Sequence, residues 1–490
     1  MLSDMHNLFH SPLRPKRSFL LWLAWWRAVQ RLRPACHRTA TFLWLAVVLA
    51  GFCLRPDLAG VTSLVRSLGL ADPCYYCLLH FFHSPALPLA SLTAAWLQTV
   101  RHLLGRRLVR INGRPVVLVD GLKRPKEGQK MPGVKSLHQE SLCNAKAPYI
   151  MGHSCQAVAL LVQSAGACLG VPIAARIHEG LVWSNRDRRS LPTKLAQLLL
   201  QCAWGEAVTI VADAAYAAGK FARRLCHRGH HLVSRVRCTA VAFFPPPKSK
   251  HPHRGRPRRY GRKTKLRHWF RLQARFHSAP SPLYDDRQVT LRYFSRDLLW
   301  RPFGQLVRFV WVIHPARGRW ILFSTDLTLS PLDILRLYGW RFKIEAGFWQ
   351  AIHTLGAYAY HFWMAAMSPI HRGQGNQHLH RKSPDYRQQV RRKLAAYERH
   401  MQIGLIAQGL LQYLALCFRH GVWANFHSYI RTIRPSVPPS EWVVAQALRH
   451  NWLDFLRFCP SAANLKKFLA PKISPPRAGF RDILELDLAA

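Results

Sequence analysis

The chain has 490 residues, of which 71 are Lys or Arg and 23 are Asp or Glu, and its formal net charge is +48 at pH 7. A hydrophobic content of 49% excludes global disorder, because so much apolar surface can offset the entropy lost on folding. The length exceeds one ordinary core, so we expect two or three domains. Self-repulsion at this charge favours a polyanionic partner, with nucleic acid the leading candidate and an anionic membrane surface the alternative.

Two apolar patches near the start of the chain are too short to span a membrane. The longer, FLWLAVVLAGFCL (42–54), has 13 residues, whereas a spanning helix needs about 20. Basic residues flank both patches on both sides, so no charge asymmetry orients them. No small-residue cleavage site follows the patch at 19–26, which argues against a signal peptide. We therefore expect buried helices in a cytoplasmic protein that has no membrane partner.

Residues 1–105 have no alternating strand pattern, and their Arg-rich and aromatic-rich segments predict an all-helical, DNA-binding domain. Within it, RPDLAGVTSLVRSLGL (55–70) has apolar residues at helical spacing and a stop signal at Gly69. This segment fits a helix–turn–helix unit, and it fits equally well a helical bundle whose basic face contacts phosphates. Both alternatives remain open.

The pattern changes at residue 107, and 106–237 predicts an α/β core with a mixed sheet flanked by helices. RLVRINGRPVVLVDG contains two strand segments that turn at Asn112-Gly113, which is a strong hairpin signal. AVTIVAD (207–213) is a continuous apolar run, as in a strand buried on both faces. The other predicted elements are strands at 115–119, 155–164, 168–178 and 230–237, and helices at 191–204 and 216–229.

Residues 238–330 predict a β-rich insertion that contains a basic linker. Strand candidates lie at 288–295, 306–314 and 319–327. Ten Lys or Arg fall between 248 and 267. We interpret this run as a phosphate-binding segment, and the alternative is a solvated linker without a binding role. The proposed DNA contacts in this segment are Arg256, Arg258, Arg259, Arg262 and Lys263. A long helix over 331–365 then completes the core, and 366–490 is helical, for DNA contact or dimerisation.

Three acids stand out in this basic chain. Asp120 and Asp213 each end a predicted strand, and Glu345 lies on the later helix. Asp after a strand is commonly a turn former or a helix N-cap, so neither is decisive alone. Together they form a set of hard oxygen ligands for Mg²⁺ or Mn²⁺, and two such ions about 4 Å apart suit phosphoryl transfer. We therefore predict a catalytic, metal-binding triad.

The predicted helix has a second feature, the spacing of the residues around Glu345. Tyr338, Arg341 and Glu345 stand at i, i+3 and i+7, so all three are expected on one face, where Tyr338 and Arg341 hold DNA. The alternative is a surface ion pair between Arg341 and Glu345, worth a few tenths of a kcal/mol.

The Tyr338, Arg341 and Glu345 spacing resembles the Tyr-Arg-Glu-Lys signature of bacterial insertion-sequence transposases of the DDE type. That resemblance implies an RNase H-like core with a β-rich insertion, and cleavage at element ends followed by transfer of the 3′-OH into target DNA. The implied partner is double-stranded DNA, both terminal inverted repeats and target, bound by a homodimer in the nucleoid. One departure is Ile352, which stands where the family has its Lys.

The resemblance also implies further DNA contacts, and it leaves alternatives open. A Trp of the insertion can stack on a flipped base in the family, which makes Trp311 and Trp320 candidates here, with core packing as the favoured alternative. A nuclease of the same fold without strand transfer, and an inactive DNA-binding remnant, are the other functional hypotheses. The remaining basic residues expected at DNA are Lys123, Lys126, Lys130, Lys135 and Lys343.

Overall fold

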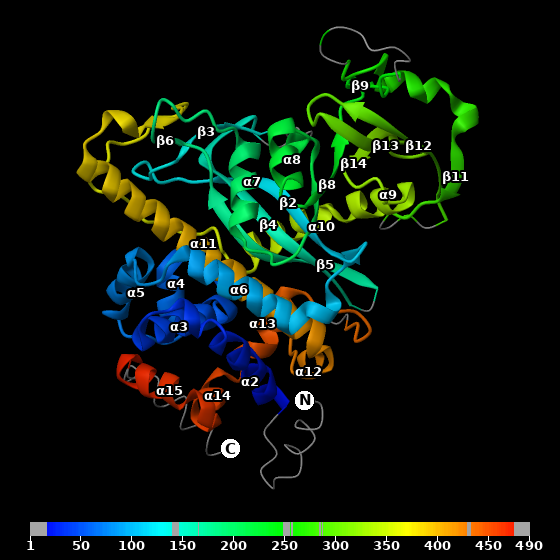
Figure 1. The fold of residues 1–490 in the computed structure, drawn as a ribbon. Helices are drawn as coiled ribbons and strands as arrows, with labels where there is room; N and C mark the ends of the chain where they lie inside the picture. The colour runs from blue at the N-terminus through cyan, green and yellow to red at the C-terminus, as the bar shows by residue number, and fades with distance from the viewer. Residues whose placement is uncertain are drawn as a thin grey trace.

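The structure is a computed structural model, and it describes residues 17–139, 147–164, 166–247, 255, 258–283, 286, 288–428 and 433–474. Within these residues one mixed sheet of 13 strands forms the centre of the molecule (Figure 1). Its strands lie in the order β10 (Lys263–Lys265), β9 (Val241–Phe243), β12 (Thr290–Trp300), β13 (Gln305–His314), β14 (Gly318–Ser324), β8 (His231–Val236), β7 (Thr209–Ala212), β2 (Arg114–Pro125), β4 (Tyr149–Ser164) and β3 (Lys135–His138).

Three further strands join the sheet beside this path: β1 (Arg110–Ile111) pairs with β2, β5 (Ala167–Ile177) with β4, and β11 (His277–Pro280) with β12. The predicted hairpin between β1 and β2 is confirmed, with φ of 48° at Asn112 and 76° at Gly113. Two successive positive φ values are what a tight two-residue hairpin turn requires. A separate two-stranded sheet pairs β6 (Leu181–Val182) with β15 (Gln377–His378).

Strand β2 lies at the centre, parallel to β7 on one side and antiparallel to β4 on the other. The predicted end of this strand at Asp120 is wrong, because β2 continues to Pro125 in register with β4. On the β7 side, however, pairing stops at Val119 opposite Ala212. Asp120 and Asp213 therefore each follow the last residue of the same parallel ladder, and this brings them to one edge of the pairing.

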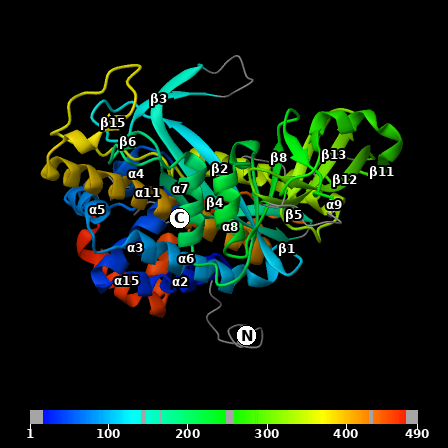
Figure 2. The same ribbon diagram turned by 45° about the horizontal axis from the view of Figure 1, so that its top comes forward.

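The strands predicted for the insertion form, but not as a separate sheet. Strand β14 pairs antiparallel with β8, so that β14, β13 and β12 extend the central sheet outward. Figure 2 shows this extension at the opposite end of the molecule from β6 and β15. The insertion also contains β9, β10 and β11, which the sequence did not predict.

Helices cover both faces of the central strands. Helices α7 (Leu191–Gln201) and α8 (Gly219–Cys226) lie in front of the sheet in Figure 1, and α10 (Phe342–His353) lies behind it, against β2 and β5. The approach of α10 to β5 is close, because a Cβ on Gly170 would stand 3.3 Å from the Lys343 carbonyl oxygen, tighter than an ordinary contact. The long helix α11 (Pro384–Cys417) also packs on β5.

The single long helix predicted over 331–365 is two helices, and the second ends at His353. Helix α9 (Pro331–Trp340) begins with the Ser330 side chain accepting a hydrogen bond from the Asp333 main-chain N–H, and it ends at Trp340. Arg341 is the junction, and α10 starts at the next residue. Arg341 itself keeps helical dihedral angles (φ −51°, ψ −40°).

The N-terminal and C-terminal helices pack together below the sheet (Figure 1). The Trp22 indole donates to the Leu448 carbonyl and the Trp26 indole to the Ser461 carbonyl, both at 3.0 Å. No helix in the described part of the chain is long and apolar enough to cross a membrane. The helices of this body are α2 (Arg17–Gln30), α3 (Thr39–Leu54), α4 (Gly60–Ser67), α5 (Cys74–His83), α6 (Leu89–Leu104), α12 (Arg419–Ala424), α13 (Glu441–Arg449), α14 (Trp452–Phe458) and α15 (Ala463–Leu469).

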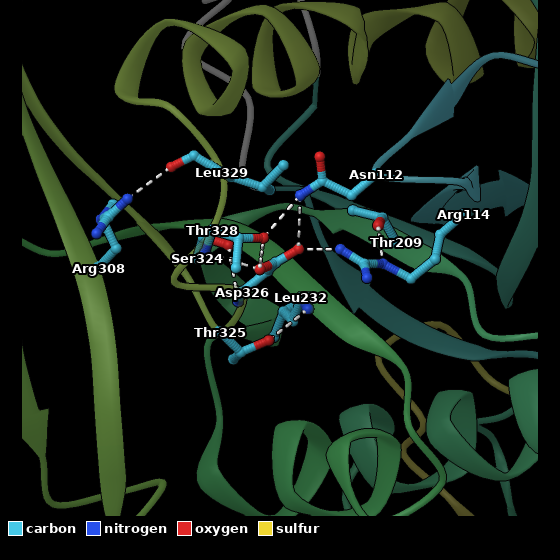
Figure 3. A network of polar contacts seen from close by, with 10 residues as sticks. All are labelled: Asn112, Arg114, Thr209, Leu232, Arg308, Ser324, Thr325, Asp326, Thr328 and Leu329. Carbon is cyan, nitrogen blue, oxygen red and sulfur yellow. Dashed lines mark hydrogen bonds and ion pairs between the residues drawn. The ribbon is translucent and has the colours of Figure 1, made fainter.

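A buried polar network anchors the start of β2 (Figure 3). The Asp326 carboxylate is 4% exposed and pairs with the Arg114 guanidinium. It also accepts hydrogen bonds from Asn112 Nδ2 at 3.3 Å and from the Thr328 hydroxyl at 2.6 Å. Because Arg114 opens β2 and Asp326 follows β14, the network ties two distant strands together. It lies at the opposite end of the parallel ladder from Asp120.

Candidate active site

Two side chains, those of Tyr338 and Arg341, together contact all three predicted acids. Arg341 Nη1 lies 2.8 Å from Asp120 Oδ2 and 2.7 Å from Glu345 Oε1. The Tyr338 hydroxyl donates to Asp213 Oδ1 at 3.3 Å. Asp120 and Asp213 thus both lie at the end of the parallel β2–β7 ladder. From the α9–α10 region, Arg341 contacts the first of them and Tyr338 the second. The alternative prediction, an ion pair between Arg341 and Glu345, is also present, as part of this larger cluster.

Burial differs strongly across the cluster. The side chains of Asp120 and Arg341 are 17% and 19% exposed, whereas that of Glu345 is 53% exposed. Burial raises the pKa of Asp120 to about 6, and the nearby Glu345 and Asp213 add to the rise. Arg341 and the Gly121 main-chain N–H act in the opposite direction. Asp120 therefore holds its proton more readily than an ordinary aspartate does.

The two groups from the helical segment respond to the acids in different ways. Burial alone would lower the pKa of Arg341, but the carboxylates of Asp120 and Glu345 more than offset it, so the pKa is raised. Burial, with the charge of Asp213, raises the pKa of Tyr338 to about 12. At neutral pH Arg341 is therefore a cation, and Tyr338 is a neutral hydrogen-bond donor.

The donor set has the chemistry of a divalent-metal site, because carboxylate oxygens are the ligands that Mg²⁺ and Mn²⁺ prefer. Its arrangement in this structure is that of an ion-pair cluster. Among the residues described, no group of three or more His, Cys, Asp or Glu side chains is placed to hold a metal ion. The position between Asp120 and Glu345 is taken by the Arg341 guanidinium. The residue types thus suit a divalent metal ion, and the Arg341 guanidinium occupies the position between the carboxylates where such a cation would bind.

Sequence reasoning missed Tyr216, a polar neighbour of the acids. The Tyr216 hydroxyl accepts a hydrogen bond from Gln156 Nε2 at 3.0 Å, and it lies so close to Gly121 that a Cβ there would approach it to 3.2 Å. Burial raises the pKa of Tyr216, and the charges of Asp120 and Asp213 add to this. Its position three residues after Asp213 was the available signal, but the sequence pattern assigned it to a helix.

The lysines that follow Asp120 differ in exposure, and the structure contradicts a DNA contact for one of them. Lys126 is 6% exposed, and its ammonium donates to the carbonyl oxygens of Tyr358 and Tyr360 at 2.5 and 3.0 Å. A basic residue was expected at the surface, but the tyrosine-rich segment after α10 covers it. The other three keep surface contacts: Lys123 with the His138 carbonyl, Lys130 with the Ala365 carbonyl and Lys135 with the Glu179 carboxylate.

The basic linker lies far from the acids in the order of the sheet. Arg258, Arg259, Arg262 and Lys263 are exposed, and Arg256 lies outside the described residues. Strands β9 and β10, which border this segment, are separated from β2 by β12, β13, β14, β8 and β7. The structure therefore does not bring the linker arginines to the acid cluster. Lys343, in contrast, is on α10, with its ammonium 4.6 Å from the centre of the Phe342 ring.

The tryptophans proposed for base stacking behave as the core-packing alternative predicts. Trp311 is fully buried, and its indole donates to the Leu266 carbonyl at 2.8 Å. Trp320 is half-buried against the His314 ring, with ring centres 5.8 Å apart. Trp311 therefore presents no face to a ligand.

The comparison with known families decides which family this is. The profile described as "DDE superfamily endonuclease" matches residues 31–293, which is 293 − 31 + 1 = 263 of the 490 residues. The chain belongs to the DDE superfamily of endonucleases. Enzymes of this superfamily generally use divalent metal ions. The matched segment of this DDE family member contains Asp120 and Asp213, and it ends before Glu345.

Other comparisons are weaker. A solved structure of piggyBac transposase in a synaptic complex with hairpin DNA is similar over 90% of this chain and 77% of that chain, with 9% sequence identity and a TM-score of 0.33. A TM-score this low does not assign a shared fold. No curated protein sequence matches the DDE family member described here.

Proposed function

We propose that this DDE family member is a transposase of the insertion-sequence type, which cleaves DNA at the ends of an element and joins the 3′-OH to target DNA. The observation that carries the proposal is the meeting of Asp120, Asp213 and Glu345 with Tyr338 and Arg341. Two acids come from one ladder edge and the third from a helix packed behind it. The spacing of Tyr338, Arg341 and Glu345 follows the Tyr-Arg-Glu part of the signature.

The topology supports an RNase H-like core. The inner strands run β5, β4, β2, β7, β8, with β2, β7 and β8 parallel and β4 and β5 antiparallel to their neighbours. Helices α7 and α8 lie on one face and α10 on the other. The strands from β9 to β14 fall between β8 and α9 in the sequence, which supports a β-rich insertion within that core.

The acids would hold the metal, which we propose to be Mg²⁺ or Mn²⁺, with two ions per site. When bound, such ions activate the attacking oxygen and stabilise the leaving oxygen of a phosphoryl transfer. The chain's own residues have separate tasks. Arg341, once released from Asp120 and Glu345, is placed to neutralise a backbone phosphate, and the Tyr338 hydroxyl is placed to donate a hydrogen bond to one.

The charge of +48 supports double-stranded DNA as the partner, in a cytoplasmic, nucleoid-associated protein that acts as a homodimer on its DNA. The terminal helical regions, 1–105 and 366–490, would contact DNA or a second copy. Exposed Arg258, Arg262 and Lys263 would contact phosphates. DNA binding should fall steeply with salt, whereas binding to anionic vesicles without DNA would favour the membrane-surface alternative.

The test is cleavage of DNA that carries the sequence flanking the coding region, with Mg²⁺. We expect Asp120→Asn, Asp213→Asn and Glu345→Gln each to lose activity by at least about a hundredfold, because each removes a charged metal ligand worth several kcal/mol. Asp297→Asn is the matched control, since it alters a carboxylate that pairs with Arg308 on the neighbouring strand, outside the acid cluster. Unchanged cleavage in the triad variants would refute the assignment.

Two alternatives are separated by a second assay with pre-cleaved 3′-OH ends. A joined product supports the transposase, whereas cleavage without joining supports a nuclease of the same fold. Ile352 in place of the signature Lys favours a third candidate, an inactive DNA-binding remnant. A wild-type protein that binds DNA but neither cleaves nor joins it would establish the inactive remnant.

A further inference from the structure

A buried polar cluster joins α10, β5, α11 and α13. Its side chains are those of Gln408 and Gln412, both on α11, and of Glu441, the first residue of α13. Glu441 is 7% exposed, and the two glutamines are 1% and 2% exposed. Because Gln408 and Gln412 stand at i and i+4, both project from the same face of α11.

The two glutamines hold α10 and β5 where these elements cross. Gln408 Nε2 donates to the Gly347 carbonyl of α10 at 2.9 Å, and Gln412 Nε2 donates to the Gly170 carbonyl of β5 at 3.3 Å. The two glycines lie close together, since a Cβ on Gly347 would stand 3.7 Å from the Gly170 carbonyl oxygen. Gly347 is two residues after Glu345 on α10. The glutamines therefore grip the helix that carries the third acid.

Glu441 ties the two glutamines to each other. Its Oε1 accepts from Gln412 Nε2 at 2.8 Å and from Gln408 Nε2 at 3.3 Å. Each side-chain nitrogen thus donates twice, and this fixes the orientation of both amides, because a flipped amide would place its oxygen against two acceptors. Among the described residues, the Oε1 atoms of Gln408 and Gln412 are buried without a hydrogen-bond partner. The cluster therefore has more acceptors than donors.

The surroundings of Glu441 favour its neutral form. Burial raises the pKa of Glu441, and the groups that oppose this rise are hydrogen-bond donors, namely its own main chain and the two glutamines. A buried carboxylate that is stabilised only by such donors is costly to ionise. A protonated carboxyl group instead adds one O–H donor to a cluster that has acceptors to spare.

We propose that Glu441 is a positioning residue of the active site, a neutral carboxylic acid that orients Gln408 and Gln412 and so fixes α10, with Glu345, against β5. This inference rests on the proposed function. Glu345 depends on such a support because its side chain is 53% exposed, and because the Arg341 guanidinium that contacts it has to leave when metal binds. Glu441 thereby connects the C-terminal helices to the acid cluster.

The experiment uses full-length variants that change hydrogen bonding with little change in side-chain volume. Gln408→Met removes the donor to Gly347, and Glu441→Met removes the acid. Glu441→Gln keeps a neutral side chain that both donates and accepts. Gln402→Met is the matched control, because Gln402 is a fully buried glutamine of the same helix that donates to the Ile173 carbonyl of β5 at 2.8 Å. The described partners of Gln402 lie on β5 and α6, outside α10.

Four quantities are measured for each protein: Mn²⁺ affinity by electron paramagnetic resonance, the cleavage rate at saturating Mg²⁺, the midpoint of urea unfolding, and the infrared spectrum of the carboxyl groups. We expect Gln408→Met and Glu441→Met to lose about ten- to a hundredfold in Mn²⁺ affinity and cleavage, as is usual when a partner that orients a metal ligand is removed. Glu441→Gln should retain both. Gln402→Met should retain both as well, whatever the change in its urea midpoint.

The infrared difference between the wild type and Glu441→Gln should contain the carbonyl band of a protonated carboxylic acid. Absence of that band, or a loss in Glu441→Gln as large as that in Glu441→Met, would show that Glu441 is ionised and would overturn the proposal. Equal effects of Gln408→Met and Gln402→Met on Mn²⁺ affinity would overturn it too, because the cluster would then support the fold and not α10 in particular. If Glu441→Met does not fold, Gln408→Met and Glu441→Gln still decide.

The outcome also separates this inference from the proposed function. If Gln408→Met and Glu441→Met keep Mn²⁺ affinity and cleavage while Asp120→Asn loses cleavage, the positioning role is wrong and the enzyme assignment stands. If the wild type neither binds Mn²⁺ nor cleaves DNA, the proposed function is wrong, and the positioning role falls with it.

Discussion

Arg341 Nη1 lies 2.8 Å from Asp120 Oδ2, which joins the α9–α10 junction to the centre of the sheet. The same nitrogen contacts Glu345, so one guanidinium bridges two of the three acids. Without that charge, two carboxylates near the buried ladder edge would repel each other and disfavour their own ionisation. Arg341 therefore keeps the acids together in the absence of metal, and it competes with metal for the same oxygens.

The first prediction concerns this competition. Arg341→Ala should bind Mn²⁺ at least about tenfold more tightly than the wild type, because removal of a cation next to two ligands is worth more than 1.4 kcal/mol. Mn²⁺ affinity is measured by electron paramagnetic resonance at pH 8, where Asp120 is ionised. Arg308→Ala is the control, since it breaks an Arg–Asp pair between β12 and β13. Equal or weaker Mn²⁺ binding by Arg341→Ala would show that the arginine does not occupy the metal position.

The second prediction concerns the network around Asp326. Asp326→Ala removes the partner of the partly buried Arg114 and the acceptor for Thr328, so we expect a loss of about 3–5 kcal/mol in the free energy of unfolding. Urea denaturation measures it. Arg336→Ala, which breaks an exposed pair with Asp333 on α9, should cost less than about 1 kcal/mol. Similar losses in the two variants would mean that the Asp326 network contributes little to stability.

The third prediction is a pH dependence set by Lys126. Burial lowers the pKa of Lys126 from 10.5 to about 7, so above pH 7 the folded protein has released a proton that the unfolded chain still binds. The stability contributed by this site therefore rises with pH between about 7 and 10.5. Relative to Lys126→Met, the wild type should gain about 2 kcal/mol in the free energy of unfolding between pH 7 and 9. Parallel stability curves for the two proteins would contradict the assigned pKa.

Local signals in the sequence predicted the elements of the site well, and they failed where tertiary packing decides. The apolar run before Asp213 and the turn at Asn112-Gly113 have direct physical causes, in two-sided burial and in positive φ. Asp120 was placed correctly beside Asp213, although β2 does not end there. The parallel ladder between β2 and β7 ends because β7 is short. The length of β7 cannot be read from the sequence of β2.

Burial of charged and aromatic side chains was the other failure. Lys126 stands in a basic stretch and so was expected at the surface, but a tyrosine-rich segment more than 230 residues later covers it. Trp349 and Trp311 are the same residue type in similarly apolar neighbourhoods, yet one is exposed and the other buried. Which side of a helix or strand meets the core is set by contacts distant in sequence, and composition does not show it.

The last prediction addresses Ile352, where the signature has a Lys. Ile352 is half-buried and packs against the hydrophobic core, whereas the next residue, His353, is exposed. Ile352→Lys should cost about 1–2 kcal/mol of stability, because a charge replaces packed apolar surface. Its DNA affinity should stay within about threefold of the wild type, since the ammonium has to turn away from the core before it can reach a phosphate. His353→Lys should instead steepen the dependence of binding on salt, by about one phosphate contact. Titration of DNA binding between 50 and 200 mM salt distinguishes them, and tighter binding or a tenfold gain in cleavage by Ile352→Lys would show that the natural chain is impaired at this position.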